Sequence, residues 1–176
     1  MLLAAVVCAG VGYLFLRRRP VLWALAAVST VPVVALTLVP TAGRSFAFCV
    51  VQFSVPTLRT VEPLANLALL FPLVFFATLA TRRPLLMVVA GVVLSAAIEV
   101  FQGLVPALGR ACDTNDWAMN SVGTVVAVLV ASALIALAGR ALSTPVDNSV
   151  DDSNVRSPRE LSTGVDKVGD ESNGRS

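Results

Sequence analysis

The sequence predicts an all-α membrane protein, a polytopic bundle of about five transmembrane helices followed by a disordered C-terminal tail. The chain of 176 residues is 56% hydrophobic and only 14% charged, whereas a soluble domain carries roughly 25% charged residues. Its mean hydropathy is +0.82. The apolar residues lie in long runs separated by short Arg-containing connections, which is typical of a chain whose solvent is lipid.

The composition also argues against several kinds of catalytic and metal-binding site. The chain has no His, so the commonest general base and the commonest metal ligand are both missing. Its three Cys form no CxxC pair, which argues against a zinc or iron–sulfur site, and we predict no cofactor. The nine Arg of residues 1–142 lie between apolar runs and therefore indicate membrane orientation. The expected partner is the lipid bilayer, not nucleic acid.

Two apolar runs open the chain. At about 1.5 Å per residue, residues 1–16 reach about 24 Å, slightly short of a ~30 Å hydrocarbon core. A signal peptide is the alternative, but the basic cluster Arg17–Arg19 follows the apolar run and does not precede it. We therefore expect a first transmembrane helix. The second run covers 21–39 after Pro20, and Pro32 is expected to kink it.

A loop over 40–62 contains Pro40, Gly43 and Pro56. Its middle, 46–55, is apolar but only about ten residues long, which is too short to span and suits an interfacial or re-entrant segment.

Three more apolar runs follow, over 63–80, 85–105 and 116–138. Phe71–Pro72 is expected to break the first of them, because proline lacks the backbone donor of a helix interior. The runs complete a membrane domain over 20–140. Residues 141–176 are rich in Ser, Asp, Asn and Gly and lack an apolar period, so they predict a disordered cytoplasmic tail without activity.

The Arg residues predict the orientation. Five spans place six Arg in short connections on one side and three in longer loops on the other, namely Arg17, Arg18, Arg19, Arg82, Arg83 and Arg140 against Arg44, Arg59 and Arg110. The positive-inside rule places the first group in the cytoplasm. The N-terminus is then outside, the C-terminus is cytoplasmic, and the 40–62 and 106–115 loops face the exterior of the plasma membrane.

Polar side chains recur at helical spacing inside the apolar runs. Ser95, Glu99 and Gln102 are spaced i, i+4 and i+7, which puts them on one helix face. The next run repeats this spacing with Asp116, Asn120 and Gly123, and the preceding run carries Asn66. All enter from the exterior side, so we expect one polar level in the outer half of the membrane. Gly123 is expected to let the last two helices approach closely.

The connection between the last two runs adds charged groups. Arg110, Asp113 and Asp116 are three residues apart, so one helical turn would align them. Asp116 suits an N-cap or first-turn position, where its carboxylate meets free N–H groups. Arg110 is a candidate partner for either Asp or for Glu99.

Two interpretations of these polar groups stay open. Interhelical hydrogen bonds that only fix packing are one. A functional site is the other, because a carboxylate within an apolar helix needs a partner or a proton. The ligand-binding candidates are Asn66, Glu99, Gln102, Arg110, Asp113, Asp116 and Asn120, and the catalytic candidates among them are Glu99, Asp113 and Asp116.

The cysteines fall into two groups. Cys49 and Cys112 lie in the two exterior loops, where an oxidising environment permits a disulfide, and two free thiols are the alternative. Cys8 lies within an apolar run and is expected to act as a small apolar residue.

The spacing Glu99-x-x-Gln102, then Arg110-x-x-Asp113-x-x-Asp116-x-x-x-Asn120-x-x-Gly123, resembles the signature of the VanZ-like family of bacterial membrane proteins. The segment NLALLFPL, which begins at Asn66, resembles a stretch of that family's preceding helix, although the family's usual Gly after the Pro is replaced by Leu73 and Val74. The resemblance covers about residues 35–138 and leaves out the first helix and the tail.

The resemblance implies a multi-pass protein acting at the cell surface, since the family's namesake is linked to teicoplanin resistance. The leading hypothesis is a site that binds or handles an envelope lipid, a glycan or a glycopeptide antibiotic. The second is a membrane-embedded hydrolase or transferase with a carboxylate pair. The third is a structural or partner-binding membrane protein. Enzymatic activity therefore stays open.

Overall fold

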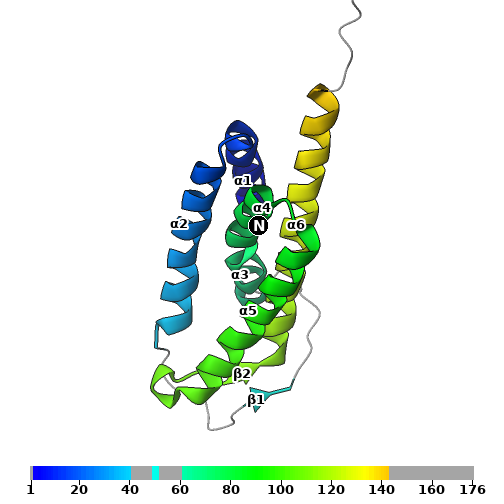
Figure 1. Cartoon of the computed structure of the whole chain (residues 1–176). Helices are drawn as coiled ribbons and strands as arrows, with labels where there is room; N and C mark the ends of the chain where they lie inside the picture. The colour runs from blue at the N-terminus through cyan, green and yellow to red at the C-terminus, as the bar shows by residue number, and fades with distance from the viewer. Residues whose placement is uncertain (1, 41–48, 52–60, 143–176) are drawn as a thin grey trace, which may run out of the picture. The chain divides into compact units, whose positions relative to one another are not determined.

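The computed structural model describes residues 2–40, 49–51 and 61–142. These residues form mostly α-helices, joined by short connections and two short strands (Figure 1). The helices are α1 (Leu2–Phe15), α2 (Arg19–Leu38), α3 (Val61–Leu69), α4 (Phe71–Thr81), α5 (Pro84–Leu104) and α6 (Thr114–Leu142).

Four helical segments in the described part are long and apolar enough to cross a membrane. They are Arg19–Leu38, Pro63–Thr81, Pro84–Leu104 and Thr114–Arg140, and the second of them joins α3 to α4. Helix α1, with 14 residues, is apolar but shorter. The predicted all-α, multi-pass membrane fold is therefore confirmed.

The break predicted within the third span lies at Leu70, between α3 and α4. Pro72 stands in the first turn of α4, where its missing backbone N–H leaves no helical bond unmade. At the other end of α4, Arg82 adopts a left-handed conformation (φ 57°), and α5 begins two residues later at Pro84. Helix α2 continues through Pro32 to Leu38.

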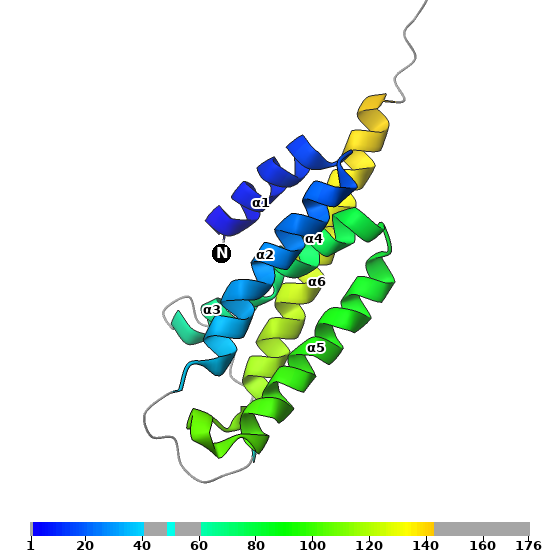
Figure 2. The same cartoon turned by 60° about the vertical axis from the view of Figure 1, so that its left-hand side comes forward.

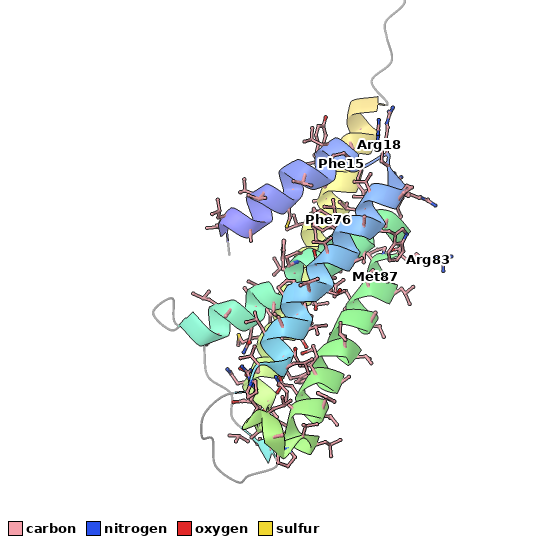
Figure 3. The ribbon with its side chains drawn as sticks, turned by 90° about the vertical axis from the view of Figure 1, so that its left-hand side faces the viewer. Phe15, Arg18, Phe76, Arg83 and Met87 are labelled. Carbon is pink, nitrogen blue, oxygen red and sulfur yellow. A yellow bond between two sulfur atoms is a disulfide. The ribbon has the colours of Figure 1, made fainter. Side chains whose placement is uncertain are left out.

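Three of the described connections between helices lie at opposite ends of the helices. The α1–α2 and α4–α5 connections lie toward the same end as the C-terminus of α6 (Figures 1 and 2). Arg18 and Arg83 lie in these two connections, and Figure 3 shows the Arg83 side chain pointing away from the helices. The opposite end holds the 3₁₀ turn Pro106–Leu108 and the strands β1 (Cys49–Val50) and β2 (Cys112–Asp113).

Helix α4 forms the centre of the core and packs against α1, α2 and α6. Phe71 and Phe75 stack with ring centroids 5.9 Å apart, and Phe75 meets Phe76 edge-on at 5.3 Å. Most of the α5 surface is exposed instead, with Leu85 at 81% and Val89 at 60%. Apolar side chains that face outward in this way suit contact with lipid.

Two glycines allow helices to approach closely. A Cβ on Gly123 of α6 would collide with the carbonyl oxygen of Leu67 in α3. A Cβ on Gly91 of α5 would lie 2.5 Å from Cγ2 of Thr124 in α6. The prediction that Gly123 brings α5 and α6 together was therefore wrong, because Gly123 faces α3 and Gly91 makes the α5–α6 approach.

The segment before α6 also differs from expectation. Cys112 and Asp113 pair in parallel with Cys49 and Val50, so the helical turn predicted to align Arg110, Asp113 and Asp116 was wrong. Helix α6 begins at Thr114 and ends at Leu142, beyond both predicted limits of 116 and 138. Most of the predicted interfacial segment 46–55, and the tail from residue 143 onward, lie outside the described residues.

Candidate functional site

One face of α5 is polar and buried. Ser95 is fully buried, and Glu99 and Gln102 are each 5% exposed. Val93 and Val100, on other faces of the same helix, are 60% and 49% exposed. Because α5 turns its polar residues toward protein and its apolar residues outward, the polar face lies against the neighbouring helices, and Figure 2 shows α6 beside α5.

Glu99 joins α5 to the segment that precedes α6. Its Oε2 atom accepts a hydrogen bond from the backbone N–H of Asp113 at 2.9 Å. The charges of Arg110, Asp113 and Asp116 all act on the Glu99 carboxylate. Four charged residues that are separated in sequence therefore form one electrostatic group.

Asp113 begins α6. Its Oδ1 atom accepts a hydrogen bond from the backbone N–H of Asn115 at 2.8 Å, which satisfies one of the free donors at the start of a helix. Asp116 lies in the first turn and is half-buried, so its carboxylate is near the positive end of the helix dipole. Of the two positions predicted for Asp116, the N-cap and the first turn, the structure has the first turn, while the Asp113 side chain bonds to the Asn115 N–H.

Two more side chains of α5 bond to backbone carbonyls of other helices. Gln102 Nε2 donates to the carbonyl oxygen of Thr37 near the end of α2, at 3.4 Å. Ser95 Oγ donates to the carbonyl oxygen of Trp117 in α6, also at 3.4 Å. The polar face of α5 therefore contacts both α2 and α6.

Three buried polar atoms have no hydrogen-bond partner within the described part of the chain. They are Arg110 Nε, Asn120 Oδ1 and Thr124 Oγ1. Asn120 is 2% exposed and Thr124 is fully buried. A buried polar group left without a partner costs about 1–3 kcal/mol. These atoms are a guanidinium N–H donor, an amide oxygen acceptor and a hydroxyl group that can donate or accept.

Sequence reasoning did not single out Thr124 or Thr37. Thr124 lies one helical turn beyond Asn120, so continuing the i, i+4 spacing along α6 would have found it. Thr37 accepts the bond from Gln102 through its backbone carbonyl. Every residue has such a carbonyl, so the sequence does not mark Thr37 as a partner.

Cys49 and Cys112 lie together. The structure joins Cys49 and Cys112 by a disulfide, with Cα atoms 4.4 Å apart. Thr114 Oγ1 adds a hydrogen bond to the carbonyl oxygen of Val50 at 3.4 Å. This link holds β1 beside β2 and ends directly before Asp113. Cys8 in α1 is buried and free.

The structure gathers six of the seven candidates at the strand-bearing ends of α5 and α6. We call these six the polar site: Glu99, Gln102, Arg110, Asp113, Asp116 and Asn120. Asn66 is half-buried on α3, next to the Leu67 carbonyl that meets Gly123. In the described ranges, no group of three His, Cys, Asp or Glu residues is placed to hold a metal ion.

Comparison with known proteins assigns the family. The family model VanZ/LLP1 matches residues 2–136, and so takes in α1, which the motif resemblance left out. Searches among curated proteins and among solved structures gave no match. The matched region contains every residue of the polar site and covers more than half of the chain. The chain therefore belongs to the VanZ/LLP1 family.

Proposed function

We propose that the polar site binds or handles the polar part of a cell-envelope component or of a glycopeptide antibiotic. The observation that carries this proposal is that Arg110 Nε and Asn120 Oδ1 are buried without hydrogen-bond partners in the described part. The charge of Arg110 also acts on the buried Glu99 carboxylate. Groups that fix packing normally pair with each other, because an unpaired buried group costs free energy. Groups poised for a ligand stay unpaired until the ligand supplies the partner.

The chemistry of the site indicates the class of ligand. Arg110 supplies a cationic donor, Asn120 supplies an amide acceptor, and Glu99, Asp113 and Asp116 supply carboxylates. Carboxylates and amides bind hydroxyl and amide N–H groups, and a guanidinium binds phosphate or carboxylate oxygens. Sugars, peptide bonds and phosphate esters carry these groups, and they are the polar parts of envelope lipids, glycans and glycopeptides.

In this proposal the polar site faces the cell exterior. The strand-bearing end that holds Arg110 lies opposite the connections that carry Arg18 and Arg83 (Figures 1 and 3). Placing the Arg-rich end in the cytoplasm satisfies the positive-inside rule. It also puts the Cys49–Cys112 disulfide in an oxidising compartment.

A complementation assay tests the proposal. A strain that lacks the protein is given the wild type, Glu99→Gln, Arg110→Ala or Asp116→Asn, and tolerance to glycopeptides and other envelope antibiotics is measured beside the membrane level of each variant. Arg140→Ala is the matched control, since Arg140 is exposed near the C-terminal end of α6. We expect the three site variants to accumulate normally and fail, while the control complements. Full complementation by all three would show that the cluster serves packing alone.

A second candidate function is a carboxylate-dependent hydrolase or transferase. The interaction of Glu99 with both Asp113 and Asp116 favours it, because neighbouring carboxylates divide the acid and base roles. Turnover separates the two candidates. If Glu99 is catalytic, Glu99→Gln abolishes product formation from an envelope substrate but leaves ligand binding largely intact.

A further inference from the structure

An apolar groove lies between α2 and α5. It has a volume of about 300 Å³ and is lined by side chains within residues 33–38 of α2 and 94–101 of α5. The seven-residue distance from Leu94 to Phe101 corresponds to about 10 Å along the helix. Thr37, a lining residue, turns its hydroxyl back to the carbonyl oxygen of Val33 at 2.7 Å, so the wall of the groove stays apolar.

The two walls belong to helices that pack on different partners. Helix α2 packs mainly on α4, whereas α5 packs mainly on α6. Val33 and Thr37 are buried, while Val34 and Leu38 are exposed, so the groove runs along the edge of the bundle. An open apolar groove within a membrane-spanning region is accessible to lipid chains.

The groove and the polar site adjoin each other. Thr37 lines the groove, and its carbonyl oxygen accepts the hydrogen bond from Gln102 Nε2. On α5, the groove residues Ile98 and Phe101 directly precede Glu99 and Gln102. Neighbouring residues of a helix point about 100° apart, so α5 presents an apolar face and a polar face side by side.

We infer that one amphipathic ligand occupies both places, with its polar head at the polar site and a hydrocarbon chain in the α2–α5 groove. This inference rests on the proposed function and narrows its ligand to molecules that carry a lipid chain. Lipid tails are as apolar as the groove, so the groove gains no hydrophobic driving force over the bilayer. Its role is to hold the chain in line with the head, while the polar site supplies selectivity.

Substitutions that fill the groove test the inference. Ala97→Trp and Val34→Trp place an indole in the groove from opposite walls, and both positions are exposed, so a larger side chain need not disturb the core. The matched controls are Val100→Trp and Val31→Trp, which are 49% and 64% exposed and do not line the groove. Arg110→Ala reports on the polar site itself.

The first readout is native mass spectrometry of each variant in nanodiscs made from the total lipid extract of the cell's own membranes. The second is the complementation assay described above. We expect the wild type to retain one lipid class in excess of its share of the extract. Both groove-filling variants and Arg110→Ala should lose at least ten-fold of that excess and fail to complement, whereas the two controls should match the wild type.

The outcomes separate the two proposals. If Arg110→Ala loses lipid and complementation while both groove-filling variants behave as wild type, the groove holds no chain and the inference is overturned, but the proposed function stands. If Arg110→Ala also behaves as wild type, the proposed function fails and the inference fails with it. A wild type that enriches no lipid class likewise overturns the inference.

Discussion

The backbone N–H of Asp113 donates a hydrogen bond of 2.9 Å to Oε2 of Glu99, and this contact joins the middle of the polar site to the start of α6. Glu99 is 5% exposed, so the bond is protected from solvent. The Asp113 side chain in turn caps α6 through Asn115. The Glu99 carboxylate thus holds the backbone of Asp113, and this backbone positions the Asp113 carboxylate.

Glu99 should separate stability from function. In Glu99→Gln the side-chain amide oxygen still accepts the Asp113 N–H, so we expect little loss of stability together with loss of complementation. Glu99→Ala leaves that donor buried without a partner, which costs about 1–3 kcal/mol. Thermal unfolding of the purified protein in detergent measures the difference. Equal stability of the two variants would show that the hydrogen bond contributes nothing to folding.

Asp113 should matter more to the stability of α6 than Asp116 does. Asp113→Ala removes the bond to the Asn115 N–H, and losing an N-cap costs about 0.5–2 kcal/mol, whereas Asp113→Asn keeps the acceptor. Asp116→Asn weakens the interaction of the side chain with the helix dipole, which is worth about 0.3–1 kcal/mol. Chemical unfolding of the three variants gives the order. A larger loss for Asp116→Asn would contradict the assignment of the cap to Asp113.

The disulfide should be detectable and should stabilise the protein. Alkylation without reductant is expected to leave Cys49 and Cys112 unmodified, and each single Cys→Ser variant to expose the other thiol. The bridge spans 63 residues of sequence, and disulfides of this kind contribute about 2–4 kcal/mol. Mass spectrometry after alkylation measures the first effect, and the unfolding temperature with and without reductant measures the second. Free thiols at both positions in the untreated wild type would exclude the bridge.

Gly123→Ala should destabilise the protein more than Gly91→Ala. The new methyl at Gly123 would collide with the backbone carbonyl of Leu67, which cannot move without shifting α3. At Gly91 it would meet the Thr124 side chain, which has some freedom to rotate. Overpacking typically costs about 1–3 kcal/mol. Gly10→Ala, where nothing lies within 4 Å, is the control and should be neutral or slightly stabilising. Thermal unfolding of the three variants gives the order, and equal losses at Gly123 and Gly10 would contradict the α3–α6 contact.

Much of this arrangement could be predicted because it depends on local patterns. The third span breaks beside Pro72 since proline removes a backbone donor. The i, i+4, i+7 spacing of Ser95, Glu99 and Gln102 predicted one face of α5, and all three are buried there. Such features depend only on residues within a few turns of one helix, so they can be predicted from the local sequence.

The features that could not be predicted depend on which segments meet. The two-residue strands β1 and β2 are too short to carry an alternating pattern, and their pairing removed Asp113 from the expected helical turn. Gly123 marked a close approach, but a glycine does not specify the helix that approaches it. The hydrogen bond from Gln102 to the Thr37 carbonyl joins residues that are 65 apart in the sequence. Its acceptor is a backbone oxygen, and every residue has one, so the residue type does not predict the bond.

Asn120 offers the sharpest separation between a packing role and a binding role. Its Oδ1 atom is buried without a hydrogen-bond partner in the described part, so Asn120→Leu removes an unpaired group and fills a similar volume. We expect the variant to be as stable as the wild type or more stable by about 1 kcal/mol, since replacing an unsatisfied group by an apolar one is neutral or favourable. We also expect it to fail complementation, because the ligand loses its acceptor.

Thr124→Val is the matched control: it removes another unpaired atom one turn away, outside the polar site, and should keep function. A destabilised Asn120→Leu protein would show that Asn120 holds the helices together, and full complementation by a stable one would remove Asn120 from the binding site.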